Sequence, residues 1–370
     1  MDNSLNINNI LSSIRGNLGE DDYLEPLEIL IDSLNKEANL SFFGSLGAKF
    51  QILNHLKTRA KVFDYISSNS LEEPSPPIFV MGLPRSGTTH LFNLLNQDDS
   101  HRSSLFWEIM YPLPLSPKGS FARRKELLKV KLILYFKNKV IPGLNELHYM
   151  EATSPEECLL IKALSLRSLV YVYMANVPSY QAYIQKSNFL PAFVWHKRFL
   201  QCLEAQEKPK RWLLKDPGHL EHIPEILKTY PDAKFIHIYR DPSETIPSIC
   251  SLTSTVRSGF SNSSDKSLIG SQTLEFWKNV LNKYSSNRDN IDPSKIIDIS
   301  YEDLIKNPLG EAKKIYSHFN FDLDIQTENS MVSYLAQSKR DHKRKHIYSP
   351  EEFGLSKEII QNELSFSTKT

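Results

Sequence analysis

The sequence predicts an α/β fold in which a parallel β-sheet of the P-loop type is flanked by helices. Two observations lead to this fold class. The apolar run "IFVMG", residues 78–82, passes directly into a turn and a helix start, "LPRSGTTHLFNLL". Later in the chain, strand-like and helix-like segments alternate, which is typical of a parallel sheet with helical crossovers. We also expect an N-terminal helical segment and a helical insertion over the active-site edge of the sheet.

Composition limits the classes of function. The chain of 370 residues is long enough for one large α/β domain with insertions or for two domains. It is 40% hydrophobic and 24% charged, which is ordinary for a soluble globular protein. Because the net charge is only +1, the composition does not support a nucleic-acid partner, and any cationic site must be local.

The cysteines and the N-terminus indicate the compartment. Cys158, Cys202 and Cys250 lie far apart, and no CxxC motif or Cys/His cluster has the spacing of metal ligands. We therefore expect neither a disulfide framework nor a metal. The polar, acidic start "MDNSLNINNILSSIRGNLGEDD" lacks the features of a signal peptide, and no run of about 18 apolar residues predicts a membrane span. These features predict a cytoplasmic protein.

Residues 1–74 are predicted to form the N-terminal helical segment. In "LEPLEILIDSLNKEANL", residues 24–40, apolar residues recur near the 3.6-residue period of a helix, and "FQILNHLKTRAKVFDYI", residues 50–66, repeats the pattern. The Pro-rich break "EEPSPP", residues 72–77, separates these helices from the first strand, at 78–82.

The main domain is predicted over residues 75–356, with a tail at 357–370. Within it, residues 100–210 carry helical patterns broken by prolines, and we interpret them as the helical insertion over the carboxyl edge of the sheet. The remaining elements are, in order, a strand at 211–216, a helix at 219–229, a strand at 233–240, a helix at 243–253, a strand at 295–300 and a helix at 310–320.

The turn after the first strand has the features of a phosphate-binding loop. Gly82 and Gly87 are five residues apart, as in the G-x-x-x-x-G part of a P-loop, and they let backbone N–H groups face an anion. The helix that follows adds its N-terminal dipole. However, Thr88 stands where a nucleotide-hydrolysing P-loop carries lysine. Arg85 supplies a positive charge instead, and Thr88 and Thr89 supply hydroxyl groups.

The string "PRSGTT" resembles the loop of sulfotransferases that use 3′-phosphoadenosine-5′-phosphosulfate (PAPS), which reads P-[KR]-S-G-T-T. The resemblance implies that this loop holds the 5′-phosphosulfate, with Arg85 neutralising charge in the transition state. Because PAPS has no γ-phosphate, the absence of the P-loop lysine is consistent with this cofactor. The implied cofactor-binding residues here are Pro84, Arg85, Ser86, Gly87, Thr88, Thr89 and His90.

A second stretch resembles the site for the 3′-phosphate in the same family. There, an arginine at a strand end and a serine eight residues later bind that phosphate, and "YRDPSETIPS" places Arg240 and Ser248 at this spacing. The guanidinium can donate two hydrogen bonds to a phosphate. Tyr301, at a strand end, is a candidate nucleotide contact. The resemblance also implies that a basic segment closes over the 3′-phosphate, and Arg344 is the candidate.

Further matches extend the resemblance over about residues 75–356. The block "LLKDPGHLEHIPEILKTYPDAKFIHIYRDP" and the segment "ISYEDLIKNPLGEAKKIYSHFNFDL" both resemble the family. The segment "IYSPEEFGLS" is similar to a signature of the bacterial-type branch, which is distantly related to tyrosylprotein sulfotransferases. The resemblance implies that residues 100–210 form the insertion that binds the sulfuryl acceptor, but these residues match only loosely, so the acceptor is not identified.

Sulfuryl transfer needs a base for the acceptor and cations for the sulfuryl and leaving-group oxygens. The resemblance implies Glu108 as the base and places Lys215 near the bridging oxygen. His219 follows the strand that ends at Lys215 and is a rival base. Glu156, Glu157 and His148 are further candidates, and the sequence alone leaves the choice open.

These patterns predict an enzyme, a PAPS-dependent sulfotransferase that needs no metal and acts on a hydroxyl or amine. A small-molecule, lipid or glycan acceptor is favoured over a protein, and the oligomeric state is left open. One alternative is a P-loop kinase or NTPase, which Thr88 disfavours. The other is a non-catalytic nucleotide-binding protein on a sulfotransferase fold, which the two intact cofactor motifs disfavour.

Overall fold

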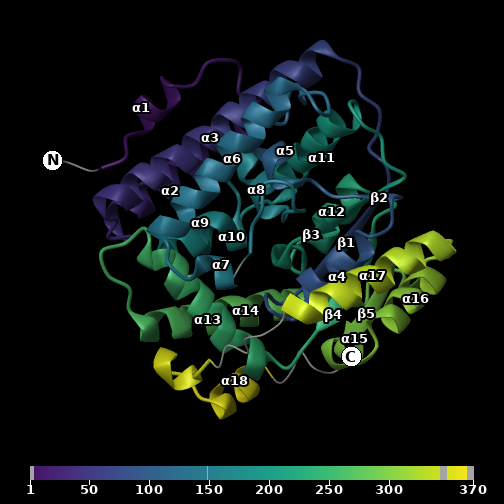
Figure 1. Cartoon of the computed structure of the whole chain (residues 1–370). Coiled ribbons are helices and arrows are strands. Elements are labelled where there is room, and N and C mark those ends of the chain that lie inside the picture. Colours follow the sequence, from purple (N-terminus) through teal and green to yellow (C-terminus); the bar gives the residue numbers. More distant parts are fainter. Residues whose placement is uncertain (1–3, 148, 342–347, 365–370) are drawn as a thin grey trace. The chain divides into compact units, whose positions relative to one another are not determined.

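The computed structural model describes residues 4–147, 149–341 and 348–364 (Figure 1). The chain forms two compact units, and each is described by itself. Unit 1 comprises Met1–Pro74, Ser104–Lys208 and Leu252–Ser264, whereas unit 2 comprises Ser75–Ser103, Pro209–Ser251 and Asp265–Thr370.

Unit 2 contains a sheet of five strands, all parallel, in the order β2-β3-β1-β4-β5. The central strand β1 pairs with β3 and β4, so that Val80 lies opposite both Lys215 and Ile236. Every residue of β1 is buried, as expected for a strand covered on both faces. The strands are β1 (Pro77–Gly82), β2 (His101–Arg102), β3 (Arg211–Lys215), β4 (Lys234–Tyr239) and β5 (Ile296–Ser300).

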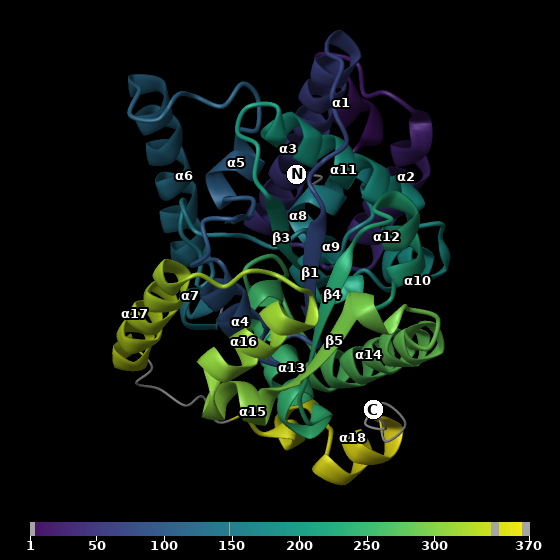
Figure 2. The ribbon, with the colours of Figure 1, turned by 90° about the vertical axis from the view of Figure 1, so that its right-hand side faces the viewer.

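Helices cover both faces of this sheet (Figure 2). On one face, Ile78 and Val80 join a core with α4 (Thr88–Leu95), α16 (Pro308–His318) and α17 (Ile325–Asp341). On the other face, the ring of Phe79 stacks on Phe235 and lies near Tyr230. The unit also contains η3 (Pro217–His219), α12 (Ile223–Thr229), α14 (Lys266–Arg288), η4 (Pro293–Lys295), α15 (Tyr301–Lys306), η5 (Pro350–Phe353) and α18 (Lys357–Leu364), whereas α13 (Pro242–Ser258) crosses the boundary at Leu252.

Unit 1 is helical in both regions where helices are predicted. The N-terminal part holds α1 (Ile7–Leu11), η1 (Asp21–Tyr23), α2 (Leu24–Lys36) and α3 (Phe42–Ser68). The later part holds α5 (Phe106–Met110), α6 (Phe121–Val140), α7 (Leu144–Leu147), α8 (Leu159–Lys162), η2 (Ala163–Ser165), α9 (Leu169–Met174), α10 (Pro178–Lys186) and α11 (Leu190–Glu204). The predicted fold class, with its parallel sheet and helical segments, is confirmed.

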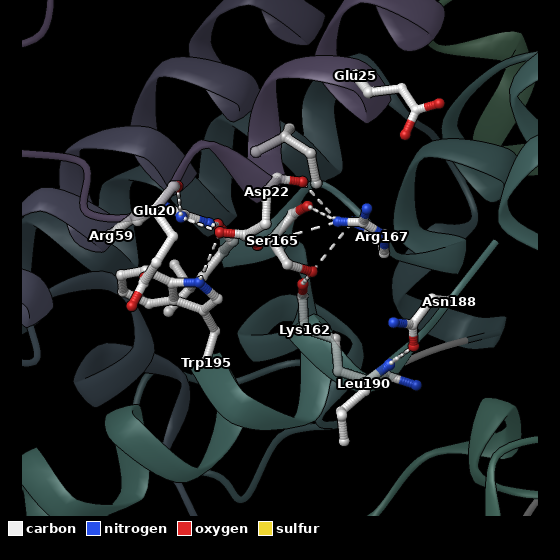
Figure 3. Close-up of polar contacts among 12 residues, drawn as sticks. Glu20, Asp22, Glu25, Arg59, Lys162, Ser165, Arg167, Asn188, Leu190 and Trp195 are labelled. Carbon is white, nitrogen blue, oxygen red and sulfur yellow. Dashed lines mark hydrogen bonds and ion pairs between the residues drawn. The ribbon is translucent and has the colours of Figure 1, made fainter. Parts of the chain in front are cut away.

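A buried arginine fixes the N-terminal segment within unit 1 (Figure 3). Arg59, on α3, is fully buried and donates to the Asp22 carboxylate and to the backbone carbonyl of Leu164 at 3.1 Å. Its guanidinium also lies 3.8 Å from the centre of the Trp195 ring. The nearby Arg167 donates to the carbonyl of Asp22 at 2.7 Å. A buried guanidinium requires such a full set of partners.

Two local predictions differ from the structure. The short strand β2 was absent from the prediction because two residues carry no periodic signal. The helix predicted from His219 instead begins at Ile223, after the single 3₁₀ turn η3. The Asp216 side chain caps this turn at the N–H of Gly218, and Pro217 favours a tight turn there. None of the described helices is both long and apolar enough to cross a membrane.

Candidate active site

Four strand ends at one edge of the unit 2 sheet carry or precede residues predicted to contact the nucleotide. Because the strands are parallel, their carboxyl ends share this edge, where ligands bind in open α/β sheets. β1 ends at Gly82 and passes into the loop, and β3 ends at Lys215. β4 and β5 end immediately before Arg240 and Tyr301. The sheet topology therefore assembles four separate sequence motifs.

The loop after β1 requires an unusual backbone. Gly87 has φ +95°, and a Cβ there would lie 2.7 Å from the ring of Tyr301. Arg85 adopts φ +70°, a left-handed conformation that is rare for a residue with a side chain. Ser86 closes the turn, because its hydroxyl donates to the Leu83 carbonyl at 2.7 Å. Helix α4 then begins at Thr88, and its first-turn N–H groups point out of the helix end, where that of His90 donates to the Gly87 carbonyl at 3.0 Å.

The two arginines predicted at opposite ends of the nucleotide are connected. The Nε of Arg85 donates to the Ser248 hydroxyl at 3.0 Å, and Nη1 of Arg240 donates to the Arg85 carbonyl at 3.1 Å. The Arg240 guanidinium also lies 4.0 Å from the centre of the Tyr301 ring. The structure thus brings Arg85, Arg240, Ser248 and Tyr301 together beside the loop.

Lys215 lies on the other side of the loop. Its side chain is buried, and its ammonium donates to the hydroxyl of Thr89 at 2.9 Å. The same ammonium is 5.4 Å from the centre of the Phe92 ring. Two cations therefore lie at the loop. Arg85 is part of the turn, and Lys215 lies beside the start of α4.

Three other predicted site residues, Pro84, His90 and His219, pack against neighbouring side chains or are buried. Pro84 is buried, and the ring of His90 lies 6.5 Å from that of Tyr334. His219 is fully buried, and its ring packs edge-on against Phe79 with 4.8 Å between ring centres. This environment is typical of a core histidine.

The predicted carboxylate bases belong to unit 1. Glu108, on α5, is buried rather than lying on the surface, and its Oε2 accepts a hydrogen bond from the backbone N–H of Leu105 at 3.0 Å. Glu156 is also buried and accepts from the N–H of Glu157 at 2.9 Å. His148 and Arg344 lie outside the described residues, so their predicted roles are not addressed by the structure.

One site residue was not predicted. Glu244, in the first turn of α13, accepts from the Nε of Arg240 at 3.0 Å and forms an ion pair with the same guanidinium. The two residues are four apart in "RDPSE", a spacing that predicts an ion pair only when both residues lie on one helix. Arg240 precedes α13, so the sequence pattern did not predict this pair. Among the described residues, no group of three His, Cys, Asp or Glu side chains is arranged to hold a metal ion.

A parallel sheet whose first strand runs into a glycine-containing loop, with cations at neighbouring strand ends, is a P-loop-like arrangement that suits group transfer. Residues 76–324 match the model of the Sulfotransferase family, and the chain belongs to this family. The family predicted from "PRSGTT" is therefore confirmed, and it favours sulfuryl transfer over nucleotide hydrolysis.

Named relatives are found in mycobacteria. The chain is 28% identical, over 256 residues, to the omega-hydroxy-beta-dihydromenaquinone-9 sulfotransferase Stf3 of Mycobacterium bovis and to that of Mycobacterium tuberculosis. These alignments cover 66% of this chain but only 62% of the length of each relative.

Solved structures agree over a longer stretch. The structure of sulfotransferase STF1 from Mycobacterium tuberculosis H37Rv matches with a TM-score of 0.86 and 28% identity, covering 99% of this chain and 100% of that one. Sulfotransferase STF9 from Mycobacterium avium shares the fold, with a TM-score of 0.84 at 24% identity, over 99% of this chain and 96% of its own.

Proposed function

We propose that this protein transfers a sulfuryl group from PAPS to a hydroxyl group of a small, lipid-like acceptor. One observation carries the proposal. Three cationic side chains, Arg85, Lys215 and Arg240, lie around the loop at a single edge of the unit 2 sheet, and each is held by a hydrogen bond. PAPS, which supplies the sulfuryl group, has phosphate groups at both its 5′ and 3′ positions, and such a ligand matches several separate cations.

The loop and Lys215 would hold the 5′ end. The N–H groups at the start of α4 and the hydroxyl groups of Thr88 and Thr89 are donors for the phosphosulfate oxygens. Arg85 would neutralise charge on the sulfuryl oxygens as the bond to the acceptor forms. Lys215, buried and bonded to Thr89, would stabilise the charge that develops on the leaving phosphate.

Arg240 and Ser248 would hold the 3′-phosphate. The Arg240 guanidinium already lies over the Tyr301 ring, which fixes its plane. The Ser248 hydroxyl accepts from Arg85 and can at the same time donate its own hydrogen to a phosphate oxygen. The Glu244 carboxylate occupies part of the guanidinium and must be displaced or shared when a phosphate binds.

Glu108 remains our proposed base. It would accept the proton of the acceptor hydroxyl, and its hydrogen bond from Leu105 fixes the orientation of its carboxylate. Its helix neighbours Phe106 and Trp107 belong to a buried apolar cluster of unit 1.

Two further observations support the nature of the acceptor and the compartment. The relative Stf3 is named for a hydroxylated menaquinone, which pairs a hydroxyl group with an isoprenoid chain. We propose an acceptor of the same chemical class here. We also propose that the protein acts in the cytoplasm, since its three cysteines are buried and none forms a disulfide.

Ligand binding and turnover test this function separately. The bisphosphate product, 3′-phosphoadenosine-5′-phosphate, should stabilise the protein by about 2.7 kcal/mol at about 100 times its dissociation constant. A thermal shift with Mg-ATP and none with the bisphosphate would contradict the cofactor assignment. Transfer of label from ³⁵S-PAPS to long-chain alcohols and to hydroquinones then tests the acceptor class, and transfer only to short hydrophilic alcohols would overturn it.

A further inference from the structure

Helix α6 is apolar on two opposite faces, although it lies at the surface of unit 1 (Figure 1). Its inner face buries Val130 and Leu134 in the cluster with Phe106 and Trp107 of α5. Its outer face exposes large apolar side chains to solvent. These are Phe121 (83% exposed), Leu128 (58%), Leu132 (48%), Tyr135 (56%), Phe136 (62%) and Val140 (53%).

The outer face of α6 is also strongly basic. The helix sequence "FARRKELLKVKLILYFKNKV" contains seven Lys or Arg residues and a single Glu. Five of these cations are exposed, namely Arg124, Lys125, Lys129, Lys131 and Lys139. The structure describes every residue of α6, and none of its exposed residues is acidic. Because the whole chain has a net charge of only +1, this positive charge is a local concentration.

A second exposed apolar strip joins the end of α6. At the start of α3, Phe42, Phe43, Leu46 and Phe50 are between 51% and 72% exposed. Residues 259–260 contact the start of α3 and the residue that follows α6. Ser41 donates its N–H to the Phe260 carbonyl at 2.8 Å, and a Cβ on Gly259 would lie 2.4 Å from Ile141, the residue after α6. The two strips therefore belong to one docking surface, comprising the outer face of α6 and the start of α3.

We propose that this docking surface binds the anionic surface of a lipid bilayer. Aromatic and leucine side chains flanked by lysines are the composition of helices that lie in the membrane interface. Lysines near an anionic leaflet each add to the attraction. A second copy of the chain fits poorly, because it would bring two sets of five exposed cations together.

The packing of α6 within unit 1 connects this surface to the proposed base. Its inner face packs directly on α5, the helix that carries the proposed base Glu108. A membrane bound to the outer face would therefore lie one helix away from α5. This part of the inference rests on the proposed function, because it explains how a water-insoluble hydroxyl acceptor reaches the enzyme without leaving the bilayer.

Vesicle flotation with the full chain tests the docking surface without PAPS or turnover. We expect binding to vesicles of phosphatidylcholine and phosphatidylglycerol in equal amounts, and little binding to phosphatidylcholine alone. Binding should weaken at 1 M salt, where the screening length falls to about 3 Å. Equal binding to both vesicles, or to neither, would overturn the proposal.

Paired variants identify the residues. Lys129→Glu/Lys131→Glu should weaken vesicle binding by at least about 25-fold, because each lost cation should weaken it by about fivefold. The matched control Lys306→Glu/Lys357→Glu makes the same change of net charge at exposed positions of unit 2 and should bind like the wild type. Leu132→Ser/Phe136→Ser should cost about tenfold or more, whereas Ile325→Ser/Ile359→Ser should cost little.

The outcomes separate this proposal from the proposed function. Vesicle binding without transfer from ³⁵S-PAPS to any acceptor leaves the docking surface standing and removes the function. Transfer to a dissolved hydroquinone with no vesicle binding supports the function and overturns the docking surface. The docking-surface proposal is also overturned if the wild type forms dimers without vesicles and the α6 variants are monomers. In that case the surface binds a second copy of the chain.

Discussion

The ammonium of Lys215 donates a hydrogen bond to the hydroxyl of Thr89 across 2.9 Å, although 126 residues separate them in sequence. The contact joins the end of β3 to the first turn of α4. A cation held there by a hydroxyl has a fixed position before any ligand binds, which is what electrostatic stabilisation of a transition state requires.

We therefore expect Lys215→Met to lower kcat by about 10²–10³, while the affinity for 3′-phosphoadenosine-5′-phosphate changes less. In the proposed reaction, the positive charge that this variant removes stabilises the leaving group mainly in the transition state. Steady-state kinetics and titration calorimetry on the same variant measure both quantities. Thr89→Ser keeps the hydroxyl partner and serves as the control. An equal loss of affinity and turnover would assign Lys215 to ground-state binding.

Arg240 and Glu244 should have opposite effects on bisphosphate affinity. Arg240→Ala removes a charge-assisted contact and should weaken binding by roughly 10- to 150-fold. Glu244→Gln frees the guanidinium from its carboxylate partner and should strengthen binding by about two- to fivefold. Titration calorimetry at low salt compares them. If Glu244→Gln weakens binding, its carboxylate positions Arg240 for the phosphate rather than competing with it.

Glu108→Gln tests the proposed base. The amide oxygen can still accept from the N–H of Leu105, so the start of α5 should be preserved. Turnover should fall by about 10²–10⁴, with cofactor affinity within a few-fold of the wild type. Glu156→Gln, at another buried carboxylate of unit 1, is the control. Wild-type turnover in Glu108→Gln together with loss of activity in His219→Ala would identify His219 as the base.

Arg59 should be important for stability rather than for catalysis. Arg59→Met leaves the Asp22 carboxylate and several carbonyl groups without their buried donor, and should destabilise unit 1 by about 3–5 kcal/mol. The nearby Arg198 pairs with the half-exposed Glu20, so Arg198→Met should cost less than about 1 kcal/mol. Urea denaturation followed by tryptophan fluorescence compares the two, and equal midpoints would contradict the structural role of Arg59.

Asp298 should make stability depend on acid pH. Burial raises the pKa of its carboxyl, but hydrogen bonds from His237 and Arg288 outweigh this and lower the pKa to about 2. Because the folded pKa lies below the unfolded value, its contribution is present above about pH 4 and is lost as the pH falls toward about 2. Asp298→Asn should be less stable than the wild type near pH 5, and the difference should narrow with acid. A constant difference in urea midpoint would exclude this linkage.

The sequence predicts the sheet better than the surroundings of the site. The strand at 78–82 is a continuous apolar run, and the strand at 233–240 is apolar at Phe235, Ile236 and Ile238, so their burial and approximate bounds follow largely from hydrophobicity. The loop is equally predictable because Gly87 and its neighbours form a specific string. The pair of Arg240 with Glu244, in contrast, depends on how a strand end meets a helix start, which no periodic pattern reports.

The burial and packing of the candidate bases also could not be predicted from a single sequence. Glu108 lies in an amphipathic stretch that suits a surface helix equally well, and its burial arises from packing against distant segments of unit 1. His219 precedes a helical pattern, yet its ring is enclosed by Phe79 from a strand 140 residues earlier. Contacts over such separations are set by topology rather than by local composition.

Arg85 carries a conformational cost for its position in the loop. A residue with a side chain at φ +70° is strained, and glycine would relieve that strain. The ligand-free fold would therefore gain stability from Arg85→Gly, while the loop would lose the charge it presents to an anion. Stability and activity thus conflict at this position. Selection of the protein for heat resistance alone would drive the chain toward an inert scaffold, beginning at this residue.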